Sequence, residues 1–287
     1  MNRDLIDIKC KQVADLTQEH CQTSAVQIEF CSLECRRGVI FGEVENLQVT
    51  RKGSADFVSQ ADISAERTIQ AELAKARPDW GFIMEEAGQI DAADKDAPCW
   101  IIDPIDGTTN FLHGIPHFAI SIAVMDKGKI TAGTVFDPAR NEFYFAETGT
   151  GAFLNGRRIR VSGRRKMTDC LFSTGIPFLG RGTAETDTLF LAEMKEIMQA
   201  SSGVRRFGAA ALDLAFVAAG RYDGFWERGL SLWDIAAGYL LVKEAGGFIS
   251  DFSARDNCLI SGDVVAANSA MHIPLLKKLR QAKESLG

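Results

Sequence analysis

Hydrophobic and polar positions follow two distinct periodicities along this 287-residue chain. Between residues 61 and 76, apolar side chains recur at helical spacing, and Pro78 follows where that helix would end. Short apolar runs at 81–84 and 98–102 indicate buried strands, and each leads directly into acidic residues. Residues 117–125 alternate large and small side chains, which predicts a further strand.

The pattern from residue 118 to 162 predicts an antiparallel meander. Apolar segments at 129–136 and 142–145 are separated by a turn-forming stretch at 137–141. Asn155-Gly156 is the strongest short signal for a β-hairpin in the chain.

The second half of the chain alternates helical and extended patterns. We expect helices over 184–200, 209–219 and 235–247 and from about Pro274, and strands over 222–227, 247–250 and 264–268. Residues 4 to about 40 have a mixed pattern that favours helix. A meander followed by alternating helices and strands predicts an α/β fold of layered, α+β type.

Composition restricts the classes of function. With 46% hydrophobic and 24% charged residues, the chain is typical of a soluble globular protein, and its net charge of −6 argues against a broad nucleic-acid surface. Seven scattered cysteines favour reduced thiols over a disulfide framework. The N-terminus is too charged for a signal peptide, and no apolar run approaches the roughly 18 residues of a membrane span. We therefore expect a cytoplasmic protein without a membrane contact.

Acidic residues follow several of the apolar segments: Glu85-Glu86, Asp103 with Asp106, Glu227, and Asp234. An isolated acid after a strand is usually a helix cap or a solvated loop residue, and Asp234 by itself fits a cap. Apolar strands end in the interior, however, where carboxylates must be paired or metal-bound. A donor set made only of oxygen atoms suits Mg²⁺ or Mn²⁺ better than zinc or copper.

Two histidines, His113 and His117, lie near these acids at a spacing of four residues. Gly114 and Pro116 interrupt any helix between them, so we expect structural roles for both histidines.

The segment DPIDGTTN, residues 103–110, places the candidate cation ligands beside candidate anion-binding amides. Pro104 restricts the backbone, so that Asp103 and Asp106 can face one point with the Ile105 carbonyl between them. Gly107 permits a tight turn, and the free amides that follow at a helix start can hold an anion. Cations next to amides are what a phosphate ester requires.

These motifs resemble the inositol monophosphatase family, in particular its bacterial extragenic-suppressor branch. DPIDGTTNF is preceded by the paired glutamates and followed by RRFGAAALDLAFVAAGRYDGFWE and WDIAAGYLLVKEAGG, in the order and spacing of that family from about Gly42 to Leu276. The resemblance implies an alternating α-β-α-β-α sandwich. It also implies an N-terminal part, residues 1–160, with the glutamate pair and DPIDGTTN, and a C-terminal part, 161–287, with the Trp-Asp ligand and the substrate pocket.

The resemblance further implies roles for individual residues. The metal ligands would be Glu85, Asp103, the main-chain oxygen of Ile105, Asp106 and Asp234. The catalytic residues would be Glu86 and Thr108, which would help to orient and deprotonate the attacking water, and Asp62, which would support an outer metal or that water. The substrate-binding residues would be Glu85, Ile105, Asp106, Gly107, Thr108, Gly208, Ala209, Ala210, Glu227 and Asp234.

The implied activity is a Mg²⁺-dependent, Li⁺-sensitive hydrolysis of a polyol monophosphate, such as myo-inositol monophosphate, by metal-activated water. Two or three Mg²⁺ ions would bind per site, with Mn²⁺ as a substitute, in a homodimer. The alternatives are fructose-1,6-bisphosphate, 3′-phosphoadenosine 5′-phosphate or histidinol phosphate as substrate, and a contact with the transcription apparatus beside catalysis. Glu227 favours a polyol, because a carboxylate can accept hydrogen bonds from two hydroxyls.

Overall fold

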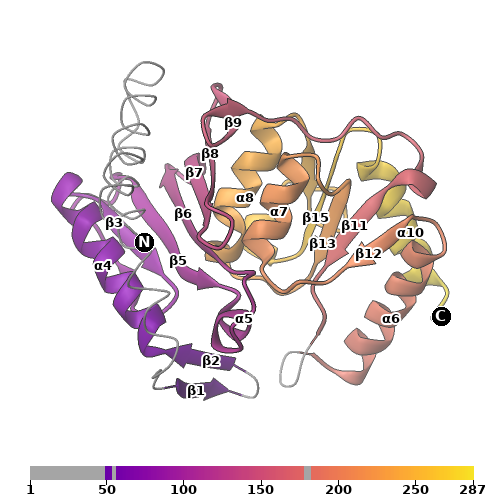
Figure 1. Cartoon of the computed structure of the whole chain (residues 1–287), viewed down its shortest axis with the longest axis horizontal. Helices are drawn as coiled ribbons and strands as arrows, with labels where there is room; N and C mark the ends of the chain where they lie inside the picture. The colour runs from indigo at the N-terminus through magenta and orange to yellow at the C-terminus, as the bar shows by residue number, and fades with distance from the viewer. Residues whose placement is uncertain (1–48, 54–55, 178–181) are drawn as a thin grey trace.

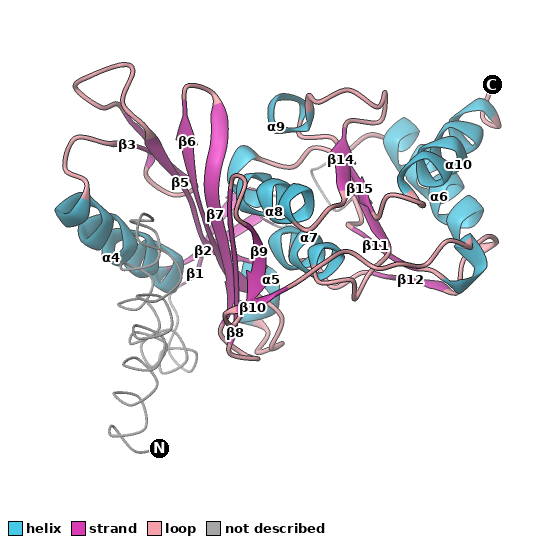
Figure 2. Ribbon diagram, turned by 90° about the horizontal axis from the view of Figure 1, so that it is seen from above, coloured by secondary structure: helices cyan, strands magenta, loops and turns pink. Residues whose placement is uncertain are grey.

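The computed structural model describes residues 49–53, 56–177 and 182–287. In these ranges the helices and sheets stack as five alternating layers, α-β-α-β-α, which is plain when the molecule is seen from above (Figure 2). Helix α4 (Gln60–Ala76) forms one outer layer, α7 (Ala210–Ala218) and α8 (Leu232–Glu244) the central layer, and α6 (Ala184–Met198) with α10 (His272–Glu284) the other outer layer. The predicted sandwich is confirmed.

The first sheet has eight strands in the order β10-β9-β8-β7-β6-β5-β3-β4, and β3 and β5 form its parallel pair. Its strands are β3 (Gly81–Met84), β4 (Gly88–Ile90), β5 (Cys99–Asp106), β6 (Ala119–Asp126), β7 (Lys129–Asp137), β8 (Glu142–Glu147), β9 (Gly151–Leu154) and β10 (Arg157–Arg158). The antiparallel run from β6 to β10 confirms the predicted meander, although residues 159–162 lie beyond its last strand.

The alternation of large and small residues in β6 explains the layering. Its larger side chains, such as Ile120 and Ile122, pack in a cluster with Ile69 of α4. Its small residues, Ala119 and Ala123, face the opposite side, in a cluster with residues of α7 and α8. A sheet face made of small side chains lets a helix approach closely.

The approach of α8 to this sheet leaves no room for another side chain. A Cβ atom on Gly133 of β7 would lie 2.8 Å from the Cα atom of Ala237, and a Cβ on Gly238 would lie 2.5 Å from Cβ of Leu214 in α7. The hydroxyl of Ser121 also donates a hydrogen bond to the Trp233 carbonyl, at 3.2 Å. These contacts place the start of α8 beside β5 (Figure 1).

The second sheet has five strands in the order β12-β11-β13-β15-β14. They are β11 (Leu171–Thr174), β12 (Gly203–Arg205), β13 (Gly224–Glu227), β14 (Phe248–Ser250) and β15 (Val264–Ala267). Phe225 of β13 packs in the central cluster, whereas Trp226 packs in the cluster with α6 and α10. Consecutive residues therefore face opposite layers, as expected for a strand.

The smaller elements are the hairpin of β1 (Val49–Gly53) with β2 (Asp56–Ser59), and the short helices α5 (Thr108–Leu112) and α9 (Cys258–Ser261). Some boundaries differ from the predictions. Strand β5 continues through Asp106 rather than ending near 102, and α8 begins at Leu232, because Ser231 and not Asp234 is its N-cap. The last helix begins at His272. The helix expected at residues 4–40 lies outside the described residues.

No described helix combines the length and the apolar character that crossing a membrane would require. The chain passes from the first sheet to the second between β10, which ends at Arg158, and β11, which begins at Leu171. The division of the chain near residue 160 stays a prediction. The central hydrophobic cluster draws side chains from both parts, for example Ile101 and Leu212.

Candidate metal centre

A backbone irregularity in β5 brings two aspartates to the same side of the sheet. In a regular strand, Asp103 and Asp106 would face opposite sides, because side chains alternate along the chain. The register with β6 shifts between them: Asp103 pairs with Ser121 and Asp106 with Ala119, so β5 has one extra residue. The amide of Ile105, inside this bulge, donates a hydrogen bond to Asp103 Oδ1 at 3.0 Å.

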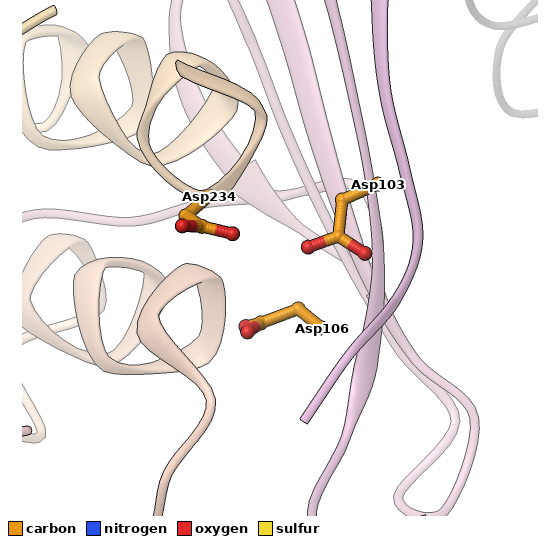
Figure 3. Close-up of side chains that lie close together, drawn as sticks. All are labelled: Asp103, Asp106 and Asp234. Atoms are coloured by element: carbon orange, nitrogen blue, oxygen red, sulfur yellow. The ribbon is translucent and has the colours of Figure 1, made fainter. Parts of the chain in front are cut away.

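A third aspartate reaches the same place from the central layer. The ligand oxygens of Asp103, Asp106 and Asp234 all lie within 4.8 Å of one another. Figure 3 shows the three carboxylates pointing toward a common space from β5 and from the start of α8. The amide of Ser231 donates to Asp234 Oδ2 at 2.7 Å and holds that carboxylate in the first turn of its helix. The convergence expected for these three residues is present.

The electrostatic environment of the cluster is acidic. Burial raises the pKa of Asp103, and the charges of Glu85, Asp106 and Asp234 raise it further. Burial and Asp234 likewise raise the pKa of Asp106, to about 8. Asp103 and Asp106 are buried and Asp234 is half-buried, and Glu85 is close enough to act on Asp103. These carboxylates repel one another unless a cation lies between them. Oxygen donors of this kind fit a hard divalent cation.

The start of helix α7 holds Asp106 in place. The Ala210 amide donates to Asp106 Oδ1 at 3.2 Å and the Ala211 amide to Oδ2 at 2.8 Å. These two donors lower the pKa of Asp106 and oppose the effect of burial. Because the first amides of a helix lack partners within the helix, the carboxylate satisfies them and its position is fixed relative to α7.

The turn after Asp106 depends on a glycine. Gly107 has a φ of +93°, in the left-handed region, and a Cβ atom there would lie 3.1 Å from the His117 carbonyl and 3.2 Å from the Gly208 carbonyl. Both conditions favour glycine. Short helix α5 begins at the next residue, Thr108.

The Thr108 hydroxyl lies between two acceptors from the predicted set. Its Oγ1 is 3.0 Å from the Ile105 carbonyl oxygen and 3.2 Å from Asp62 Oδ1. Asp62 is fully buried in the first turn of α4. A hydroxyl has one proton to donate, so Thr108 can donate to either oxygen.

Glu85 and Glu86 follow the end of β3, next to β5. The carboxylate of Glu66 accepts hydrogen bonds from the amides of Glu86 and Ala87, both at 2.8 Å. Glu66 is nearly buried and lies one helical turn after Asp62 on α4, so both acids face the site from the outer layer.

The remaining expected substrate-binding residues lie on the α7 side of the cluster. Gly208, Ala209 and Ala210 lead into α7, and Asn110 fixes this segment by donating from Nδ2 to the Phe207 carbonyl at 2.7 Å. Glu227 ends β13 and is close enough to Asp106 to raise the pKa of that residue. The structure thus brings the predicted residues around one centre.

Several residues at the site were not foreseen from the sequence: Glu66, Gly175, Ala211 and Asp213. Gly175 contacts the Glu227 carboxylate so closely that a Cβ atom would overlap it. Asp213 is buried in α7 with Oδ1 lacking a hydrogen-bond partner, and burial together with Glu227 raises its pKa. Only Glu66 had a usable signal, its helical spacing from Asp62; the others depend on contacts between distant segments.

The two histidines do not belong to the carboxylate cluster. His113 is exposed, while His117 is buried with its ring 5.0 Å from the ring of Phe207. Burial lowers the pKa of His117 to about 4, and Arg140 lowers it while Asp137 opposes the change.

Comparison with known proteins identifies the family. The model of the "Inositol monophosphatase family" matches residues 18–284. An inositol-1-monophosphatase of Mesorhizobium japonicum is 56% identical over 84% of this chain and 89% of its own. The Nus factor SuhB of Pseudomonas aeruginosa is 47% identical over 84% of this chain and 90% of its own.

The fold gives the same result. The crystal structure of the extragenic suppressor protein suhB from Bartonella henselae superimposes with a TM-score of 0.85 at 48% identity, covering 90% of this chain and 99% of that one. The relatives from Pseudomonas aeruginosa and Bartonella henselae carry the name SuhB, that of the extragenic suppressor protein, and the Mesorhizobium relative carries the family name. The chain therefore belongs to the inositol monophosphatase family and is an enzyme of the phosphatase class.

Proposed function

We propose that this protein is a Mg²⁺-dependent phosphatase that hydrolyses a polyol monophosphate, with myo-inositol monophosphate as the substrate. The observation that carries the proposal is the cluster of buried Asp103 and Asp106 with half-buried Asp234, whose ligand oxygens lie within 4.8 Å of one another. The name of the Mesorhizobium relative supports the choice of substrate.

The donor set fits the proposed cations. Glu85 and the Ile105 carbonyl would complete a set made only of oxygen atoms, which suits two or three Mg²⁺ ions, or Mn²⁺ as a substitute. Bound divalent cations would supply Lewis-acid polarisation of the phosphoryl group and of the attacking water, together with neutralisation of the charge on the ester.

The residues of the chain would position the reactants. The Thr108 hydroxyl can donate to Asp62 Oδ1. Together with Glu86 these residues would orient the attacking water, and a carboxylate would accept its proton. The amides of Gly107 and Thr108 would hold the phosphate oxygens. On the opposite side, Glu227 would accept hydrogen bonds from two hydroxyls of the polyol, in a pocket formed by Gly208, Ala209 and Ala210.

The test is a Mg²⁺ titration of phosphate release, with and without Li⁺. The panel contains inositol 1-phosphate, fructose 1,6-bisphosphate, 3′-phosphoadenosine 5′-phosphate and histidinol phosphate. We expect the highest kcat/KM with inositol 1-phosphate, an absolute requirement for divalent cation, and inhibition by Li⁺. A higher kcat/KM with any other ester would replace the proposed substrate, and activity in EDTA would exclude the metal mechanism.

A second candidate function comes from the relative in Pseudomonas aeruginosa, which is named a Nus factor. We propose a contact with the transcription apparatus as the alternative, beside catalysis by a cytoplasmic homodimer. The test is co-purification with RNA polymerase for the wild-type chain and for Asp106→Asn. If the wild type and Asp106→Asn both co-purify with RNA polymerase, the result would support a binding role independent of catalysis. If neither co-purifies, this candidate function is removed.

A further inference from the structure

The loop between β13 and α8 connects two proposed functions. It starts at Glu227, proposed to bind the polyol, and it ends at the helix turn that presents Asp234 to the metal cluster. Contacts outside the site hold its middle: the Leu230 amide donates to the Gly262 carbonyl at 2.9 Å. The position of Glu227 therefore depends on how the first residues of this loop are anchored.

Arg228, the residue after Glu227, is anchored in the outer layer. Its Nη1 donates to Oε2 of Glu193 in α6 at 2.7 Å, and its guanidinium carbon lies 3.4 Å from the centroid of the Phe252 ring. Glu193 is fully buried, although it is an acid on an outer helix. Arg228 thus extends away from the site while its neighbour faces it.

The alternation of β13 accounts for this division. Phe225 packs in the central layer and Trp226 packs in the cluster with Ile197 of α6. Side chains of a strand alternate, so Glu227 faces the central layer, where it acts on Asp106, and Arg228 faces α6. Because Arg228 directly follows Glu227 in the chain, anchoring the Arg228 side chain on α6 restricts where the Glu227 backbone can lie.

The ion pair between Arg228 and Glu193 adds little to the free energy of folding. Removing two charges from water costs free energy that the pair recovers only with complete hydrogen bonding. Here the indole N–H of the neighbouring Trp226 faces Glu193 and favours its charged form, but Oε1 of Glu193 and Nε1 of Trp226 are buried without a hydrogen bond of normal length. Burial raises the pKa of Glu193, although Arg228 opposes the change. Because a buried ion pair adds little net stability but does restrict conformation, we ascribe to this pair a role in placing the loop.

We infer that Arg228 is a positioning residue for substrate specificity: its ion pair with Glu193 and its stacking on Phe252 fix the end of β13 so that Glu227 meets the hydroxyls of the substrate. The inference rests on the proposed function of Glu227. The amides proposed to hold the phosphate, those of Gly107 and Thr108, lie outside this loop, and the bond from the Leu230 amide to Gly262 anchors the loop between Arg228 and Asp234. The pair therefore affects binding of the polyol and not the hydrolytic step.

The test replaces both partners, Glu193→Leu with Arg228→Met, so that no buried charge is left alone. The matched control is Glu196→Leu with Lys278→Met, which removes another ion pair of α6, the one with α10 at 3.0 Å. KM and kcat are measured with inositol 1-phosphate and with p-nitrophenyl phosphate, which has no polyol. A third variant, Arg228→Lys, keeps the charge and leaves Glu193 in place.

For the double variant we expect KM for inositol 1-phosphate to rise at least fivefold, while kcat and both constants for p-nitrophenyl phosphate stay within twofold. The control should match the wild type, and Arg228→Lys should recover part of the loss in KM. An unchanged KM for inositol 1-phosphate, or equal changes with the two esters, would overturn the inference.

Glu227→Gln separates this inference from the proposed function. If Glu227→Gln raises KM for inositol 1-phosphate and the double variant does not, the positioning role of Arg228 is wrong and the polyol pocket stands. If Glu227→Gln leaves that KM unchanged, the proposed pocket itself is wrong, and the inference falls with it.

Discussion

Gly175 lies directly against the carboxylate of Glu227, with no space for a Cβ atom between them. The two residues follow and end neighbouring parallel strands, β11 and β13. The hydroxyl of Thr174, just before the glycine, donates to the Trp226 carbonyl at 2.7 Å, just before the glutamate. The two strand ends are thus joined, and the absence of a side chain at 175 sets where Glu227 can lie.

Gly175→Ala should displace Glu227 and weaken binding of the polyol. We expect KM for inositol 1-phosphate to rise about tenfold, equivalent to roughly 1.4 kcal/mol, because one hydroxyl-binding group is misplaced. Steady-state kinetics with p-nitrophenyl phosphate provide the control, since this ester does not use Glu227. An unaltered KM for inositol 1-phosphate would contradict the proposed role of Glu227.

Asp106→Asn should remove turnover and leave the fold intact. We expect kcat at saturating Mg²⁺ to fall by about 10³ or more, since a proposed metal ligand loses its charge. The asparagine can accept with one oxygen only, so one of the Ala210 and Ala211 amides loses its acceptor, at a cost of about 1–2 kcal/mol in the free energy of unfolding. Urea titration and phosphate release measure the two effects. A near wild-type rate would refute the ligand assignment.

Asp103→Asn should separate stability from metal binding. Burial and three neighbouring acids disfavour the charge on Asp103, whereas asparagine can still accept from the Ile105 amide. In EDTA we expect the free energy of unfolding of the variant to be at least that of the wild type, and higher by up to about 1 kcal/mol. Added Mg²⁺ should raise the melting temperature of the wild type and have a smaller effect on the variant. An equal rise in both proteins would place the cation elsewhere.

His117 should make the fold sensitive to acid. Its pKa is lowered from 6.5 to about 4 by burial, so between these values the unfolded chain binds a proton that the folded protein does not. The free energy of unfolding therefore falls as the pH decreases from 6.5 to about 4. His117→Phe, which keeps an aromatic ring against Phe207, should show a smaller decrease across this window. Urea titrations at several pH values measure it, and parallel curves would exclude His117 as a cause.

The layered fold could be predicted because local patterns specify its elements. The large and small residues of β6 alternate so clearly that one face packs against α4 and the other against α8. The boundaries that differ lie where polar residues take structural roles, as at Ser231, which caps α8 in place of Asp234. This capping role is not visible in hydrophobic periodicity alone.

The sequence by itself determined the chemistry of the centre, namely its oxygen-donor acids and the glycine turn at Gly107. It also indicated the family. Those features lie in short motifs, where neighbouring residues suffice. Only the tertiary structure decided the geometry. The extra residue in β5 turns Asp103 and Asp106 to one side, the small residues beneath α8 let Asp234 approach them, and Gly175 and Arg228 set the place of Glu227. These relations join segments far apart in the chain, and close packing between layers, rather than local propensity, fixes their distances.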